Sequence, residues 1–244
     1  MIDVDRGTAE SAWRDDPVLD ALQPFVVNPT GDVVVVAPHP DDEVLGVGGI
    51  LRSLHRGGRR IVVAALSDGE ASHPGTNGIT ARELERRRPR ESRAALDRLG
   101  LAGCEIVRFG VPDGAIASHL AAVAAGLEEL VTPEATVLAT WRGDGHPDHE
   151  AAGHATAQVC ASRGARLVEY PVWMWNWAVP GDGRVPWTRA RSSTLDTDAR
   201  VAKAAAIAEF RSQVEPVGDG PNDGPVLPDA VLDHHRRGFE VVFT

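Results

Sequence analysis

The sequence predicts an α/β protein with a mostly parallel, Rossmann-like sheet, flanking helices and a C-terminal extension. From about residue 32 to residue 170, short apolar runs alternate with longer segments of helical character. The apolar runs are continuous, as in strands that helices cover on both faces. After Pro171 this alternation stops. We therefore expect a single domain over residues 1–244, with a core at about 32–170 and an extension at about 171–244.

The helices expected between the core strands have recognisable ends. Gly57 and Gly58 follow the first helix, and glycine is common directly after the C-terminal end of a helix. The second helix begins at Thr80, where Glu83 completes the spacing of a capping box, and stops at Gly100. In chain order the expected elements are the strand Asp32–Ala37, the helix Val44–His55, the strand Arg60–Leu66, the helix Thr80–Leu99, the strand Glu105–Phe109, a helix from about Ala117 to Val131, the strand Ala135–Thr140, the helix Asp148–Ser162 and the strand Arg166–Tyr170.

The extension has a less regular pattern. Trp173, Trp175 and Trp177 alternate, so on a strand they would share one face, which suits either a substrate wall or a buried core or interface. We expect His234 and His235 at the surface. The other expected elements are a short peripheral helix before residue 32, the strand Arg189–Leu195, the helix Asp196–Gln213, the loop Glu215–Pro228 and the strand Phe239–Phe243.

Composition and charge exclude several classes of partner. The formal net charge of −10 argues against nucleic acid and anionic membranes, because phosphate binding depends on Lys and Arg. Two cysteines, Cys104 and Cys160, give no disulfide framework and suit a reducing compartment. We expect no signal peptide, because the first residues are acidic and lack an apolar run, and we expect no membrane span, because no apolar run is long enough for one. We expect a cytoplasmic protein with a small-molecule partner, and a homo-oligomer stays open.

Polar residues follow four of the expected strands. In open parallel sheets, ligands bind beyond the carboxyl ends of the strands. The residues in question are His39, Asp41, Asp42 and Glu43 after the first strand, Ser67, Asp68 and Glu70 after the second, Asp113 after the third, and Arg142, Asp144, His146, Asp148 and His149 after the fourth. The sequence therefore predicts a site at this edge of the sheet.

The two densest loops read His39-Pro-Asp-Asp and His146-Pro-Asp-His. Together they offer two histidines and a carboxylate with an open coordination position, which is the donor set of a catalytic zinc. Of two adjacent aspartates, one can bind the metal and the other can take a proton from the bound water. Other interpretations stay open: a hydrogen-bonded turn without metal, Asp41 as a helix cap, and His146 as a structural neighbour.

These residues resemble the motifs of a known family. Ala-Pro-His39-Pro-Asp41-Asp42-Glu43 followed by Gly48-Gly49, and His146-Pro147-Asp148-His149, are similar to motifs of the PIG-L/LmbE-like zinc-dependent deacetylases. The similarity covers roughly residues 32–154 and includes Arg88-x-x-Glu91 and Pro112-Asp113-Gly114. The resemblance implies a hydrolase that removes the N-acetyl group from an N-acetylglucosaminyl conjugate.

The resemblance also implies a role for each matching residue. His39, Asp42 and His149 would bind zinc, and Asp41 would be the general base. His146 would stabilise the oxyanion or protonate the leaving amine, with Asp148 orienting a histidine, and Arg88 and Asp113 would contact the substrate. Some members carry a tyrosine two residues before the first histidine of the second motif. Here that position is Asp144, so its assistance must come from elsewhere.

Alternative functions remain at this stage. Fe(II) could replace zinc in the same hydrolysis, or the same donor types could belong to a non-haem Fe(II) oxygenase. An amidase for another N-acyl or thiol-conjugate substrate, and a sugar-binding protein without catalysis, also fit the residues. The motifs do not identify the aglycone, and we expect the C-terminal extension to select it.

Overall fold

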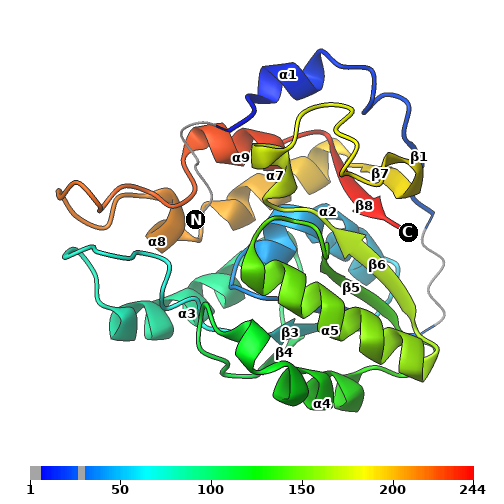
Figure 1. The fold of residues 1–244 in the computed structure, drawn as a ribbon, viewed down its shortest axis with the longest axis horizontal. Helices are drawn as coiled ribbons and strands as arrows, with labels where there is room; N and C mark the ends of the chain where they lie inside the picture. The colour runs from blue at the N-terminus through cyan, green and yellow to red at the C-terminus, as the bar shows by residue number, and fades with distance from the viewer. Residues whose placement is uncertain (1–6, 27–30) are drawn as a thin grey trace.

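The centre of the protein is an eight-stranded sheet with the order β1-β7-β8-β6-β5-β2-β3-β4. The computed structural model describes residues 7–26 and 31–244. Within these residues β8 pairs antiparallel with both of its neighbours, and the other pairs are parallel. The strands are β1 (Gln23–Pro24), β2 (Val33–Ala37), β3 (Ile61–Ala65), β4 (Glu105–Arg108), β5 (Thr136–Thr140), β6 (Arg166–Tyr170), β7 (Ala190–Thr194) and β8 (Phe239–Phe243). The predicted mostly parallel α/β fold is confirmed (Figure 1).

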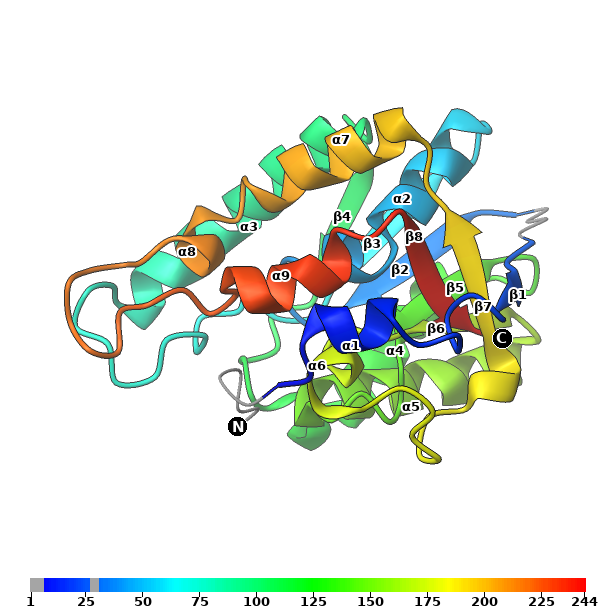
Figure 2. The ribbon, with the colours of Figure 1, turned by 90° about the horizontal axis from the view of Figure 1, so that it is seen from above.

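Helices cover both faces of the sheet (Figure 2). Val33 and Val35 pack into a core with α2, α3, α7 and α9, whereas Val34 and Val36 pack with α4 and α5. The continuous apolar run of β2 is therefore buried on both faces, as its sequence predicts. The α-helices are α1 (Glu10–Arg14), α2 (Asp42–Arg56), α3 (Ala81–Leu99), α4 (Leu120–Leu130), α5 (Pro147–Arg163), α6 (Met174–Trp177), α7 (Thr197–Ile207), α8 (Arg211–Val214) and α9 (Asp229–His235), with 3-10 turns η2 (Ile116–Ser118) and η3 (Trp187–Arg189).

Local sequence signals set the ends of α3. The Thr80 side chain accepts from Glu83 N, and the Glu83 side chain accepts from Thr80 N, so the predicted capping box is present. Gly100 ends the helix with φ = 88°, a conformation that glycine adopts at little cost. Both predicted ends of this helix are confirmed.

The extension departs from several predictions. The tryptophan stretch is not a strand, because residues 174–177 form the helical turn α6 and the three side chains diverge. Trp173 faces a cavity, Trp175 packs on Trp13, and Trp177 stacks on Trp141. The predicted helix Asp196–Gln213 is two helices, α7 and α8, since residues 208–210 end the first.

The C-terminal histidines are not at the surface. They lie on α9, an element that the sequence analysis did not predict, and each is 4% exposed. His234 faces Glu10 of α1, and His235 faces the carbonyl of Leu45 in α2. Within residues 7–26 and 31–244, no helix combines the length and the apolar character that crossing a membrane requires.

Candidate active site

The two histidine-aspartate motifs meet at the carboxyl ends of β2 and β5, which are neighbouring parallel strands. His39 follows β2, and Asp42 begins α2, two residues before the predicted start of that helix. His149 lies in the first turns of α5, which follows β5. Neighbouring strands therefore bring together residues about a hundred positions apart, as predicted for an open parallel sheet.

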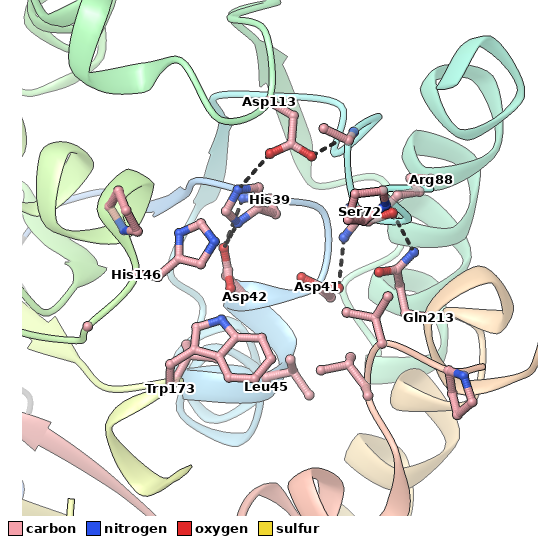
Figure 3. Close-up of a pocket in the computed structure, with 18 residues that line it drawn as sticks. His39, Asp41, Asp42, Leu45, Ser72, Arg88, Asp113, His146, Trp173 and Gln213 are labelled. Carbon is pink, nitrogen blue, oxygen red and sulfur yellow. Dashed lines mark hydrogen bonds and ion pairs between the residues drawn. The ribbon is translucent and has the colours of Figure 1, made fainter. Parts of the chain in front are cut away.

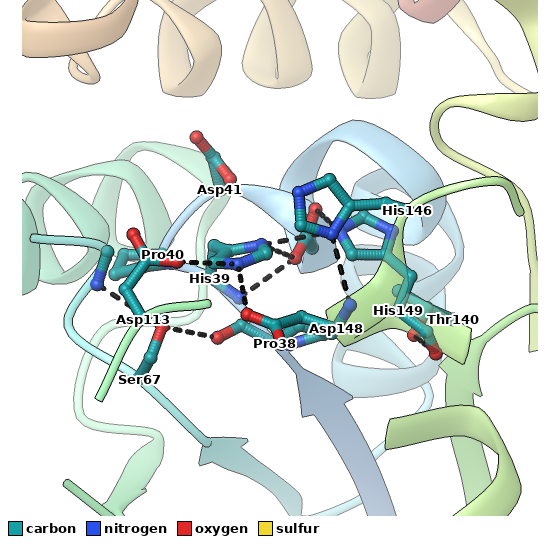
Figure 4. Close-up of polar contacts among 12 residues, drawn as sticks. Pro38, His39, Pro40, Asp41, Ser67, Asp113, Thr140, His146, Asp148 and His149 are labelled. Carbon is teal, nitrogen blue, oxygen red and sulfur yellow. Dashed lines mark hydrogen bonds and ion pairs between the residues drawn. The ribbon is translucent and has the colours of Figure 1, made fainter. Parts of the chain in front are cut away.

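His39, Asp42 and His149 form a triangle of possible metal ligands, called here the donor triangle. The His39 and His149 rings lie next to each other in Figure 4. His39 Nδ1 lies 3.3 Å from Asp42 Oδ2, His149 Nε2 lies 3.2 Å from Asp42 Oδ1, and the two ring nitrogens are 3.3 Å apart. A tetrahedral zinc with bonds of about 2.0–2.1 Å holds its ligands about 3.3 Å apart. The residues present therefore fit a zinc ion, and the mixed nitrogen and oxygen donors also suit Fe²⁺.

The opposite nitrogen of each imidazole faces carboxylates. His39 Nε2 lies 3.2 Å from Asp113 Oδ1 and 3.4 Å from Asp148 Oδ2. His149 Nδ1 lies 2.8 Å from Asp144 Oδ2. Metal-binding histidines commonly donate their second N–H to a carboxylate, which fixes the tautomer and the ring. Donation at these positions leaves His39 Nδ1 and His149 Nε2 as lone-pair donors inside the triangle.

Asp144 has a positioning role that the sequence analysis missed. Its side chain is fully buried and faces His149. The same carboxylate accepts hydrogen bonds from the backbone N–H groups of Val172, Trp173 and Met174. The sequence places Asp144 at this edge of the sheet and at the position of the missing tyrosine, but it gives this residue no role. The one available signal was a carboxylate five residues before a candidate histidine ligand, and the chain segment 172–174 that completes its environment is remote in sequence.

Asp113 and Asp148 are held by backbone N–H groups. Asp148 accepts from Gly114 N and Ile116 N, and Asp113 accepts from Ala71 N. Burial opposes the charged form of His39, but hydrogen bonds with Asp113, Asp148 and Asp42 outweigh it and raise the pKa of His39 well above its usual value. Positive charge is thus favoured at the centre of these carboxylates, which is the environment that a cation requires.

Asp41 is held beside the triangle in an unusual backbone conformation. Its φ of 155° makes it the one non-glycine residue with positive φ in the described segments, and such strain is concentrated at functional sites. Its side chain makes no helix-capping bond. Instead, Arg88 Nη2 donates to Asp41 Oδ2 at 2.8 Å. Burial raises the pKa of Asp41 to about 6 against the opposing charge of Arg88, which is near the range suited to a general base at neutral pH.

Arg88 and Glu43 hold the base from either side. Arg88 is buried on α3 and also donates to the carbonyls of Gly69 and Pro40. Burial raises the pKa of Glu43 to about 8, so this carboxyl group is neutral at pH 7. Glu43 accepts from Asp41 N and from Ser92 Oγ. Glu43 lies in the first turn of α2, and these bonds indicate a structural role for it.

His146 lies at the mouth of the triangle. It is the N-cap of α5, its Nδ1 accepts from Asp148 N at 3.3 Å, and its ring centroid is 5.0 Å from that of His39 and 4.8 Å from that of His149. His39, His146 and His149 each offer a ring nitrogen within 4.8 Å of the others. Burial, together with the two neighbouring imidazoles, lowers the pKa of His146 to about 4.

Six of these residues line one cavity of ≈ 370 Å³ (Figure 3). The cavity is lined by His39, Asp41, Asp42, His146, Arg88 and Asp113, whereas His149, Asp144 and Asp148 lie behind them. Figure 3 shows Trp173 and Leu45 on the side opposite Asp113. The extension supplies most of the apolar wall, through Val172, Trp173, Pro225, Val226 and Leu227.

Comparison with known proteins gives one family and several relatives. A model of the PIG-L family, described as GlcNAc-PI de-N-acetylase, matches residues 34–160, just over half of the chain. The diacetylchitobiose deacetylase of Thermococcus kodakarensis is 29% identical over 134 residues, which are 54% of this chain and 49% of that protein. The chain thus spans about half the length of this curated relative.

Two solved structures share the architecture. The pseudoaglycone deacetylase Dbv21 is 25% identical with a TM-score of 0.61, over 87% of this chain and 96% of that chain. A structure described as the zinc inhibited form of teicoplanin deacetylase Orf2 is 18% identical with a TM-score of 0.62, over 87% and 97%. The second likeness shows a shared fold.

Proposed function

The chain belongs to the PIG-L family, and from this premise we propose that it is a metal-dependent deacetylase that hydrolyses the N-acetyl group of an N-acetylglucosaminyl conjugate. The observation that carries the proposal is the donor triangle of His39, Asp42 and His149 beside a buried base, Asp41, whose carboxylate is held by Arg88 and lines the same cavity as His39 and Asp42. Hydrolysis needs a metal, a base and an open position, and this arrangement supplies residues for each.

His39, Asp42 and His149 would hold Zn²⁺, and Fe²⁺ fits the same donors. When bound, such an ion acidifies water and polarises the amide carbonyl. Asp41 takes the proton from the attacking water at its carboxylate. Arg88 keeps that carboxylate oriented while it is ionised, since the guanidinium is 2.8 Å away.

His146 acts on the other side of the scissile bond. It faces the cavity from the N-terminus of α5, so we assign to it the stabilisation of the oxyanion or the protonation of the leaving amine. Asp148 and Asp144 hold the rings of His39 and His149 in the orientation that metal binding needs.

The substrate would lie across the cavity from the metal to the extension. Arg88 and Asp113 line the cavity, and we propose that they contact the sugar while they also hold Asp41 and His39. The apolar wall of Leu45, Trp173 and Val226 would receive the aglycone. This wall favours an uncharged, partly apolar group, because burying an unpaired charge against it is costly.

The test is acetate release from a panel of N-acetylglucosaminyl conjugates, with metal analysis of the same preparation. We expect acetate release that a chelator abolishes and Zn²⁺ or Fe²⁺ restores. The panel includes other N-acyl amides and thiol conjugates. Turnover of those amides alone would change the proposed substrate class but agree with a hydrolase. Activity that requires oxygen and a keto acid would contradict the proposal.

A further inference from the structure

A buried ion pair from the C-terminal extension lies in a kink of α2, the helix that begins with Asp42. Val47 departs from helical geometry (φ −139°, ψ 19°), so α2 consists of a first turn and a longer second part. Lys203 of α7 and Glu240 of β8 are 3% and 4% exposed, and Lys203 Nζ lies 2.6 Å from Glu240 Oε1. No role at the site has been assigned to either residue.

Each member of the pair binds backbone on one side of the kink. Lys203 Nζ donates to the carbonyl of Leu45 at 2.8 Å. Glu240 accepts from Gly49 N at 2.7 Å and from Ile50 N at 2.8 Å. In an uninterrupted helix the N–H of Gly49 would donate to the carbonyl of Leu45. The ion pair therefore bridges the two backbone groups that a regular turn would join.

His235 adds a third contact at the same carbonyl. Its Nδ1 lies 3.2 Å from Leu45 O, so α9 also reaches the kink. The first turn packs closely on the sheet, because a Cβ at Gly46 would lie 2.2 Å from the Tyr170 ring. Lys203 of α7 and His235 of α9 thus hold the first turn at Leu45, and Glu240 of β8 holds the part of α2 beyond the kink.

The first turn of α2 holds three groups of the site. Asp41 is its N-cap, Asp42 is its first residue, and Leu45 lines the cavity. A single helical turn has little stability of its own, so outside contacts decide its orientation. We infer that Lys203 and Glu240 are positioning residues that set the direction of Asp42 toward His39 and His149.

The inference rests on the proposed function, because it concerns the geometry of the proposed metal ligands. The deciding variant is Lys203→Met/Glu240→Gln, which removes both charges and leaves no unpaired buried ion; either single change leaves one partner unpaired and is more disruptive. The matched control is Glu10→Gln. Glu10 forms a partly buried contact with His234 and Arg237, and within the described residues no hydrogen bond or ion pair joins it to α2.

The readouts are Zn²⁺ affinity by chelator competition, the visible spectrum of the Co²⁺-loaded protein, and hydrogen exchange of residues 42–50 in the metal-free protein. For the double variant we expect about 10-fold weaker Zn²⁺ binding, as for other groups that orient metal ligands. We also expect a changed Co²⁺ spectrum and faster exchange in residues 42–50. Glu10→Gln should lower the unfolding temperature and leave all three readouts unchanged.

Three results would overturn the inference, and they can be told apart. A double variant with wild-type Zn²⁺ affinity and an unchanged Co²⁺ spectrum overturns it alone. A wild-type protein that binds no Zn²⁺ overturns the proposed function and this inference with it. Equal loss of affinity in the double variant and in Glu10→Gln would assign the effect to general stability and also contradict it.

Discussion

The β2 and β5 loops and the C-terminal residues 171–244 shape the same cavity by different means. The loops carry the donor atoms in two short motifs, and parallel strand pairing places those motifs together. The C-terminal residues supply none of the three proposed metal ligands. They provide the apolar wall, hold Asp144 through the backbone of residues 172–174, and bind the kink in α2. The reactive side chains thus come from two short motifs, whereas their orientation and the shape of the substrate cavity depend on contacts between segments remote in sequence.

The largest expected effect comes from removing a donor of the triangle. His149→Ala takes away one of the three proposed ligands and should abolish stoichiometric metal binding and acetate release. Metal analysis after gel filtration measures the first, and an acetate assay the second. Stoichiometric metal in this variant would show that His149 is not a ligand. It would also contradict the division between loops that supply the metal ligands and C-terminal residues that orient them.

A smaller effect is expected at Asp144, where the two regions meet. Asp144→Asn keeps the shape but weakens the interaction with His149 Nδ1, 2.8 Å away. Loss of such a partner costs about 10–100-fold in metal affinity or activity. Chelator competition measures the affinity. An unchanged value would mean that the backbone, and not Asp144, orients His149.

The apolar wall should affect substrate binding more than chemistry. Trp173→Ala removes contact area from the cavity without touching the donors. For a conjugate with an apolar aglycone we expect KM to rise about 10-fold with kcat nearly unchanged, since the lost contact is the same in ground state and transition state. Steady-state kinetics on matched conjugates with and without the apolar group test this. An equal rise of KM for both conjugates would contradict the proposal that the apolar wall binds the aglycone.

The smallest effect on function is expected from the salt bridge that joins α1 to α9. Burial opposes ionisation of Glu10, but His234 and Arg237 outweigh it and lower its pKa to about 2. A depressed carboxylate pKa stabilises the fold above the unfolded-state value near 4.5, and this stability is lost as the pH falls toward 2.

Glu10→Gln should therefore lower the free energy of unfolding at pH 7 by about 1–3 kcal/mol and leave acetate release unchanged. Denaturant unfolding from pH 7 to pH 2 measures this difference. It should shrink between about pH 5 and pH 2. A constant difference across that range would assign the effect to packing of α1 instead.

The same contrast explains what the sequence could reveal. The strands, the capping box at Thr80 and the meeting of the two motifs follow from short patterns and from the geometry of parallel sheets. The helical turn at Met174–Trp177 was missed because alternation of three tryptophans also fits a strand, and Asp144 fixes this segment through backbone bonds. Lys203, His235 and Glu240 carry no local signal, since their burial arises only when α7, α9 and β8 pack on α2.

The central claim is that Asp42 and Asp41, adjacent in sequence, have different roles. It is tested most directly by Asp41→Asn, with metal content and single-turnover acetate release measured on the same sample. We predict a full complement of metal and a rate that falls by at least about 100-fold, because the proton acceptor is lost while the donor triangle is intact. Wild-type turnover in this variant, or loss of the metal along with the activity, would contradict that division of roles.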